Sequence, residues 1–129
     1  MGKKVSILIR TKNEGRWIKQ CLSSVNRQKY RNFEVILVDN MSTDATVKKA
    51  SKYDVKHVNI ENYKPGYAIN QGVENSTGDI FIILSGHCVP TSEFWLENLI
   101  NNLADENVAG VYGRQEPLSF SADSDKRDL

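Results

Sequence analysis

The sequence has no long apolar run among its 129 residues. Its longest is the five-residue run at 80–84, whereas a helix needs about 20 apolar residues to span a bilayer. The apolar stretch after the N-terminal lysines is also too short for the core of a secretory signal peptide. We therefore expect a soluble, cytoplasmic protein.

Cysteine is scarce, and neither sign of charge is in excess. Cys21 and Cys88 stand far apart without a Cys-x-x-Cys pair, so we expect two reduced thiols. Two histidines and two scattered cysteines are too few for a structural zinc site, which needs about four ligands. Seventeen basic residues balance sixteen acidic ones without a long basic block, so nucleic acid is not an expected partner.

Common signatures of nucleotide binding and catalysis are also absent. The segment 10–15 reads RTKNEG and matches neither G-x-G-x-x-G nor the P-loop. His87 and Cys88 are adjacent, and adjacent side chains of an extended segment point in opposite directions, so a Cys-His nucleophile pair is not expected. A receiver-type signalling domain would carry its phosphorylated Asp after the third strand, whereas Asp39 follows the second predicted strand.

The chain instead alternates apolar runs with segments of helical periodicity. Continuous apolar runs are typical of strands buried on both faces of a parallel sheet. We expect strands at 5–9, 33–38, 55–58, 80–84 and 108–112. We expect helices at about 17–25, 42–52, 67–74 and 92–103. The prediction is a three-layer α/β/α fold around a mostly parallel sheet, with Cys21 in the core and Asn13 as the N-cap of the first helix.

Polar residues follow each of the first four predicted strands. In such sheets the carboxyl ends of the strands form one rim, where ligands bind near the topological switch point. The segments expected at this rim are 11–14, 39–42, 59–61 and 85–87. Asp39 could accept hydrogen bonds from a nucleobase or a ribose there, or it could cap the next turn. Asp44 has a simpler explanation, because the helix dipole favours an acid in a first helical turn.

Several short motifs occur in a fixed order along the chain. Segment 5–46 reads VSILIRTKNEGRWIKQCLSSVNRQKYRNFEVILVDNMSTDAT, and segment 66–79 reads GYAINQGVENSTGD. The first contains Thr-x-Asn-Glu after an apolar strand, then Cys-Leu-x-Ser-Val, a Gln followed by Tyr, and Val-Asp-x-x-Ser-Thr-Asp. Together they closely resemble the N-terminal part of family-2 glycosyltransferases over at least 4–100. The resemblance implies a GT-A fold, similar to nucleotide-diphospho-sugar transferases, and transfer of a sugar with inversion.

The resemblance also implies a donor site for a nucleoside diphosphate sugar. It places around the base and ribose Thr11, Asn13, Glu14 and Asp39, with Asp44 and Asn70 as further members of the pocket. The later segment 111–117, VYGRQEP, is similar to a subset of the family. Arg114 could then reach a phosphate, or it could be a strand-end arginine on a solvated edge.

The fourth predicted strand departs from the family pattern. Family members carry Asp-x-Asp there, and the last acid holds a divalent metal that neutralises charge developing on the leaving diphosphate. This chain has Ser85, Gly86 and His87 instead. Ser85 could bond a ribose or a phosphate oxygen. His87 could ligate Mn²⁺ or Mg²⁺, assist the diphosphate without a metal, or mark a loss of activity; we favour metal ligation.

The general base that an inverting transferase requires is not recognisable in the sequence. Family members carry it in an acceptor-binding half, so we expect it beyond Leu129 and assign no catalytic residue. We expect a nucleotide-sugar-binding domain at 1–117, and a polar tail or the start of the acceptor half at 118–129. On this interpretation the C-terminal half is missing, and the chain alone would turn over poorly or not at all.

The resemblance finally suggests substrates and partners. The full enzyme would transfer a hexose or deoxyhexose to a glycan or lipid-linked acceptor in polysaccharide or cell-surface glycan synthesis, with peripheral membrane association. Apolar surface exposed where a second half would pack predicts a homo-oligomer. The alternative is a non-catalytic nucleotide-binding or scaffold domain that retains the fold.

Overall fold

The computed structural model describes residues 2–105, 107–108 and 110–111. The chain divides into two compact units, Met1–Leu96 and Glu97–Leu129. The first unit contains the four described strands and three complete helices, whereas most of α4 (Trp95–Leu103) belongs to the second. The four strands and their connections therefore form one unit that can be described by itself.

The sheet consists of four parallel strands in the order β3-β2-β1-β4. Their bounds are β1 Val5–Thr11, β2 Phe33–Asp39, β3 Lys56–Asn59 and β4 Ile80–Ser85. The apolar residues of β1 and of the second half of β2 are buried, as expected of central strands covered on both faces. Four of the predicted strands are thus confirmed to within two residues at either end.

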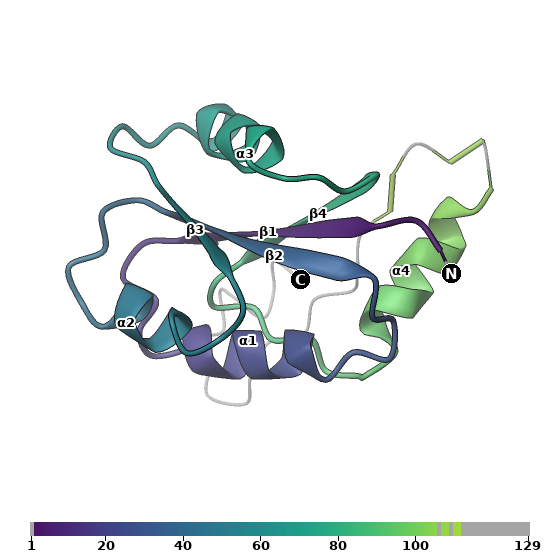
Figure 1. Ribbon diagram of the computed structural model, residues 1–129, viewed down its shortest axis with the longest axis horizontal. Helices are drawn as coiled ribbons and strands as arrows, with labels where there is room; N and C mark the ends of the chain where they lie inside the picture. Colours follow the sequence, from purple (N-terminus) through teal and green to yellow (C-terminus); the bar gives the residue numbers. More distant parts are fainter. Residues whose placement is uncertain (1, 106, 109, 112–129) are drawn as a thin grey trace, which may run out of the picture. The chain divides into compact units, whose positions relative to one another are not determined.

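Helices cover both faces of this sheet (Figure 1). α1 (Ile18–Asn26) and α2 (Thr46–Ala50) lie on one face, and α3 (Pro65–Glu74) lies on the other. α3 approaches closely because Gly72 faces the sheet: a Cβ there would lie 3.0 Å from Leu8 Cδ1 and 3.2 Å from Val38 Cγ2. The three-layer α/β/α prediction is confirmed for this unit.

On the face of the sheet opposite α3, the core includes the apolar stripe of α1. Ile18, Cys21 and Val25 have no exposed surface. Burial raises the pKa of the Cys21 thiol to about 12, with smaller contributions from Cys88 and Glu14. Cys21 is therefore a core residue, as predicted, and an unreactive thiol.

Some predicted elements differ from the structure. Asn13 does not cap α1, which starts at Ile18 after Trp17 and has no side-chain cap. α2 covers Thr46–Ala50 and is shorter than expected. The described part of 108–112, namely 108 and 110–111, is not in a strand.

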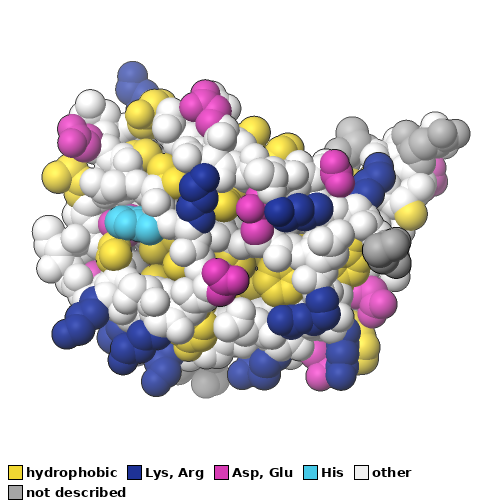
Figure 2. Space-filling view, viewed as in Figure 1, with side chains coloured by type: hydrophobic (Ala, Val, Ile, Leu, Met, Phe, Trp, Pro, Cys, Tyr) yellow, Lys and Arg dark blue, Asp and Glu magenta, His cyan; other side chains and the backbone are white. Residues whose placement is uncertain are grey.

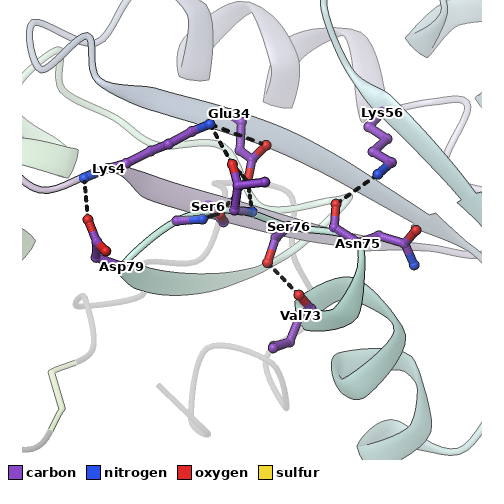
Figure 3. A network of polar contacts seen from close by, with 10 residues as sticks. Lys4, Ser6, Glu34, Lys56, Val73, Asn75, Ser76 and Asp79 are labelled. Atoms are coloured by element: carbon purple, nitrogen blue, oxygen red, sulfur yellow. Dashed lines mark hydrogen bonds and ion pairs between the residues drawn. The ribbon is translucent and has the colours of Figure 1, made fainter.

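A polar network ties the amino ends of the strands together (Figure 3). Ser6 is buried in β1; its hydroxyl donates to Glu34 Oε2 at 2.6 Å and accepts from the N–H of Gly78 at 2.8 Å. The N–H of Thr77 also donates to Glu34 Oε2, at 2.6 Å, and Lys4 Nζ lies 3.8 Å from Oε1. These contacts hold the segment before β4 against β1 and β2.

Candidate functional site

The carboxyl ends of the four strands form one rim. The register pairs Thr11 with Asp39, Asp39 with Asn59, and Arg10 with Ser85. β2 and β3 follow β1 on one side and β4 lies on the other, so the topological switch point is between β1 and β4. Ligands of open α/β sheets bind outside the strand ends at such a point.

Asp39 at the end of β2 is 1% exposed. Its Oδ1 accepts hydrogen bonds from Thr11 Oγ1 at 2.5 Å and from Ser42 Oγ at 2.6 Å, and its Oδ2 accepts one from the Ser42 N–H at 2.9 Å. The turn-capping role of Asp39 is therefore observed. A carboxylate offers about four acceptor positions, so a further donor can still be accommodated.

Asn13 joins the loop after β1 to the loop after β2. Its φ of 53° lies in the left-handed region, which Asn tolerates better than most residues. Its Oδ1 accepts hydrogen bonds from the N–H groups of Thr43 at 2.8 Å and Asp44 at 3.3 Å. Its own N–H donates to Ser42 Oγ at 2.8 Å. Asn13 thus fixes the shape of the rim instead of capping a helix.

Asp44 connects the same two loops. Its Oδ1 accepts hydrogen bonds from the Thr46 hydroxyl and, at 2.9 Å, from the Thr46 N–H, and its Oδ2 accepts one from the Gly15 N–H at 3.0 Å. The bond from the Thr46 hydroxyl is the main cause that lowers the pKa of Asp44; partial desolvation opposes it, and the backbone donors add to it. Asp44 therefore has a structural role near the start of α2.

The switch point brings together Glu14, Ser85 and His87. His87 Nδ1 lies 3.1 Å from Glu14 Oε1 and 3.1 Å from Ser85 Oγ. The side chain of His87 is 56% exposed and that of Glu14 is 19% exposed. The imidazole is therefore accessible to a ligand, and a sheltered carboxylate lies beside it.

Gly86 allows β4 to end this close to β1. Its N–H donates to the carbonyl oxygen of Arg10 at 2.9 Å. A Cβ at this position would lie 2.7 Å from Thr11 Cγ2 and 3.1 Å from Glu14 Cγ. The middle residue of Ser-Gly-His thus has no room for a side chain, which explains why it is glycine.

The residues at the switch point fit only one kind of metal site. Among the described residues, no three His, Cys, Asp or Glu side chains are grouped as metal ligands would be. Mg²⁺, however, usually takes one or two carboxylates and completes its shell with substrate phosphates and water. Glu14 and His87 fit a cation that arrives with a diphosphate, and they do not fit a metal held by protein alone.

A cleft of about 560 Å³ continues the rim beyond β3. It is lined by Asn59, Ile60, Glu61, Asn62, Lys64 and Tyr67. Arg10 connects the end of β1 to this region, because its Nη1 donates to the Tyr63 hydroxyl at 3.3 Å. Arg10 Nε is buried and has no hydrogen-bond partner among the described residues. Arg10 is not among the predicted site residues, although its charge at the end of an apolar strand was a usable signal.

One predicted site residue, Asn70, is not brought to this cluster. Asn70 is exposed on α3 and is not among the residues that line the cleft. Arg114 lies outside the described residues.

Surface charge and helix length bear on possible partners. Figure 2 shows Lys and Arg side chains along much of the lower edge of the view, where Figure 1 places α1 and α2, and shows side chains of both charges scattered over the rest of that face. Within the described ranges, every helix is too short or too polar to cross a lipid bilayer.

Proteins of known sequence resemble this chain over much of its length. It is 36% identical over 105 residues to dolichyl N-acetyl-alpha-D-glucosaminyl phosphate 3-beta-D-2,3-diacetamido-2,3-dideoxy-beta-D-glucuronosyltransferase of Methanococcus voltae, a match of 74% of this chain and 32% of that protein. It is 34% identical over 120 residues to glycosyltransferase AglE of Haloferax volcanii, a match of 87% and 39%. The chain thus spans between three and four tenths of the length of these relatives.

Solved structures share the fold. The mannosyltransferase PcManGT of Pyrobaculum calidifontis, in complex with GDP-Man and Mn²⁺, superposes with a TM-score of 0.78 at 25% identity, over 84% of this chain and 34% of that one. S. aureus TarS 1-349, in complex with UDP-GlcNAc, gives 0.71 at 24% identity, over 90% and 37%. Both comparisons support the GT-A fold.

A family model confirms the resemblance noted from the motifs. The model described as glycosyl transferase family 2 matches residues 6–126, which is nearly the whole chain. The parallel sheet, the rim built by Asn13 and Asp39, and this match together show that the chain belongs to the family-2 glycosyltransferases.

Proposed function

We propose that this chain is the donor-binding part of an inverting glycosyltransferase, which moves a sugar from a nucleoside diphosphate sugar to an acceptor hydroxyl. The observation that carries the proposal is the grouping of Glu14, Ser85 and His87 at the switch point, on the rim that Asp39 also lines. This is the part of an open α/β sheet where a ligand is expected.

Recognition of the nucleoside involves the rim and the cleft beyond β3. Asp39 accepts from the base or the ribose with its remaining acceptor capacity, and Asn13 and Asp44 hold the loops that surround it. Thr11 acts through Asp39, because its hydroxyl already donates to that carboxylate. Asn70 and Arg114 remain proposed members of the donor site.

Recognition of the diphosphate falls to the switch point. Ser85 donates a hydrogen bond to a phosphate oxygen, and Arg10 offers a cation from the neighbouring strand end. We propose that His87 would hold a divalent metal, Mn²⁺ or Mg²⁺. When bound, such a metal supplies Lewis-acid stabilisation of the leaving diphosphate.

The proposed reaction is a single displacement. The acceptor oxygen forms a bond to the anomeric carbon while the bond from that carbon to the diphosphate oxygen breaks. The nucleoside diphosphate leaves, and the hydroxyl proton passes to a general base. We assign no residue of this chain to the base.

The name of the Methanococcus voltae relative supports a lipid-linked acceptor, because it includes a dolichyl-linked sugar phosphate. We propose transfer of a hexose or a related sugar in the synthesis of a cell-surface glycan or polysaccharide. Two free thiols agree with a cytoplasmic location. For a lipid-linked acceptor we also propose peripheral membrane contact by the whole enzyme.

A non-catalytic nucleotide-binding domain is the second candidate. It is favoured by one observation, the absence of a carboxylate at both Ser85 and His87. Because the fold and rim are common to both candidates, only turnover distinguishes them.

Calorimetric titration with UDP, GDP and dTDP, each with and without Mn²⁺, tests the donor site. We expect one nucleotide to bind, with its affinity raised by Mn²⁺ at least about tenfold, or 1.4 kcal/mol. Inorganic pyrophosphate serves as a competitor that reports on diphosphate recognition alone. The donor-site proposal fails if none of the three nucleotides binds under either condition. Absence of donor turnover in the full-length protein would favour the second candidate.

A further inference from the structure

We infer that Glu14 supplies the carboxylate that the segment 85–87 lacks, and that Glu14 and His87 together form the protein half of a divalent-cation site. The other half is the donor diphosphate, so the inference rests on the proposed function. The carboxylate would then come from the loop after β1 instead of the end of β4, where the family carries it.

The distance between the two candidate ligand atoms supports this assignment. In an octahedral Mg²⁺ site with bonds of about 2.1 Å, neighbouring ligand atoms lie about 3.0 Å apart. Glu14 Oε1 and His87 Nδ1 are 3.1 Å apart. The two atoms are therefore already spaced for adjacent positions on one cation, which would take the place of the proton between them.

The backbone holds both ligands in place. The carbonyl oxygen of Glu14 accepts hydrogen bonds from the N–H groups of Trp17 at 2.9 Å and Ile18 at 2.8 Å, in the turn that leads into α1. His87 follows Gly86, whose N–H is bonded to β1 and which has no space for a Cβ beside Glu14. A site built on such supports needs little reorganisation to bind.

The composition of the pair predicts when a cation binds. One carboxylate and one neutral imidazole provide a single negative charge and two ligand atoms, which is too little to hold Mg²⁺ or Mn²⁺ firmly. A diphosphate adds oxygen ligands and charge on the solvent side, where His87 is more than half exposed. We therefore expect weak binding of Mn²⁺ alone and much tighter binding in the presence of UDP or GDP.

Electron paramagnetic resonance of free Mn²⁺ measures this directly. Titrations use the chain with Mn²⁺ alone, with UDP and with GDP. Glu14→Gln should weaken Mn²⁺ binding in the nucleotide complex at least about tenfold. Loss of a residue that only supports a metal ligand already weakens metal binding by about that factor, and a direct ligand should matter at least as much. Metal-free nucleotide affinity should fall by a smaller factor than Mn²⁺ affinity does. Glu74→Gln, an exposed acid on α3, is the matched control and should leave Mn²⁺ binding unchanged.

A rescue variant separates ligation from folding. Glu14→Gln combined with His87→Asp returns one carboxylate to the site and should recover most of the Mn²⁺ affinity, with an unchanged circular dichroism spectrum. The inference is overturned if Glu14→Gln retains wild-type Mn²⁺ affinity while UDP or GDP still binds. If the wild-type chain binds none of UDP, GDP and dTDP, the proposed function fails as well.

Discussion

Gly86 is a position of the candidate site at which one added carbon atom has a large expected effect. Its Cβ would approach Thr11 Cγ2 to 2.7 Å and the carbonyl oxygen of Arg10 to 3.3 Å. Gly86→Ala must therefore push the end of β4 away from β1, at a cost of about 1–3 kcal/mol in the free energy of unfolding. Urea denaturation measures this loss, and nucleotide affinity should fall with it.

Gly66→Ala is the matched control for that substitution. Gly66 lies in the first turn of α3, and no atom of the described residues lies within 4 Å of a Cβ built there. Alanine in a helix should leave stability unchanged or raise it by up to about 1 kcal/mol. Equal effects of the two substitutions would contradict the close contact at Gly86.

Single residues were predictable from sequence where their chemistry is local. Cys21 on an apolar helical stripe is buried as predicted. Asp44 was expected in a first helical turn, but it lies before α2 and accepts a hydrogen bond from the Thr46 N–H. Asn13 was not predictable in the same way, because its partners Thr43 and Asp44 lie 30 and 31 positions away. The Glu14–His87 contact spans 73 positions and depends on strand order, which no local pattern specifies.

At the scale of elements, the network at the amino ends of β1 and β2 predicts a pH dependence. Burial acts to raise the pKa of Glu34, but hydrogen bonds from Ser6 and the Thr77 N–H, together with Lys4, outweigh it and lower the pKa overall. Because the pKa of Glu34 is lower in the folded chain, its carboxylate stabilises the fold at pH values above the pKa that Glu34 has in the unfolded chain. This contribution is lost as the pH falls through the lower folded pKa.

Glu34→Gln should therefore destabilise the chain at pH 7 by about 1–2 kcal/mol, because it replaces charge-assisted hydrogen bonds with neutral ones. Urea denaturation from pH 7 to pH 3 should show the gap to wild type closing below about pH 4.5, near the ordinary pKa of Glu. Glu74→Gln should show no such gap. A difference that stays constant with pH would contradict the role given to the Glu34 carboxylate.

The sequence specifies the strands better than the helix starts. Buried runs such as Ile7–Ile9 are apolar because helices cover both faces of the sheet, so the sequence indicates these strands directly. α2 starts at Thr46 instead of at about 42. Asn13 does not cap α1, because its side chain bonds to the loop after β2. Gln28 is a second case in which contacts distant in sequence were not predictable. It is buried, its Nε2 donates to the Ser92 carbonyl oxygen, and its Oε1 accepts from the Leu96 N–H, and the periodicity of the sequence does not indicate either contact.

At the scale of the whole molecule, β4 is one of the two edge strands of the described sheet, and β3 is the other. Phe81 and Ile83 on this strand are 43% and 46% exposed. Neighbouring exposed apolar side chains on an edge strand favour association. We expect the chain to self-associate through β4 in a concentration-dependent way, measurable by light scattering.

Phe81→Ser combined with Ile83→Thr should shift that equilibrium toward the monomer. Met41→Ser changes an exposed apolar residue elsewhere and should leave it unaltered. A monodisperse monomer of the wild-type chain at all concentrations would contradict the prediction of self-association.

The length of β4 has a consequence for protein engineering. Its first residue is anchored near Lys4 and its last precedes the Ser-Gly-His turn, with six residues in the strand. Removing one residue would shift His87 by about 3.3 Å and turn it toward the opposite face of the sheet. The length of β4 therefore determines where His87 lies and which way it faces. A designer who transplants the Ser-Gly-His turn to another scaffold must keep the number of strand residues between Ile80 and the turn, as well as the three residues of the turn.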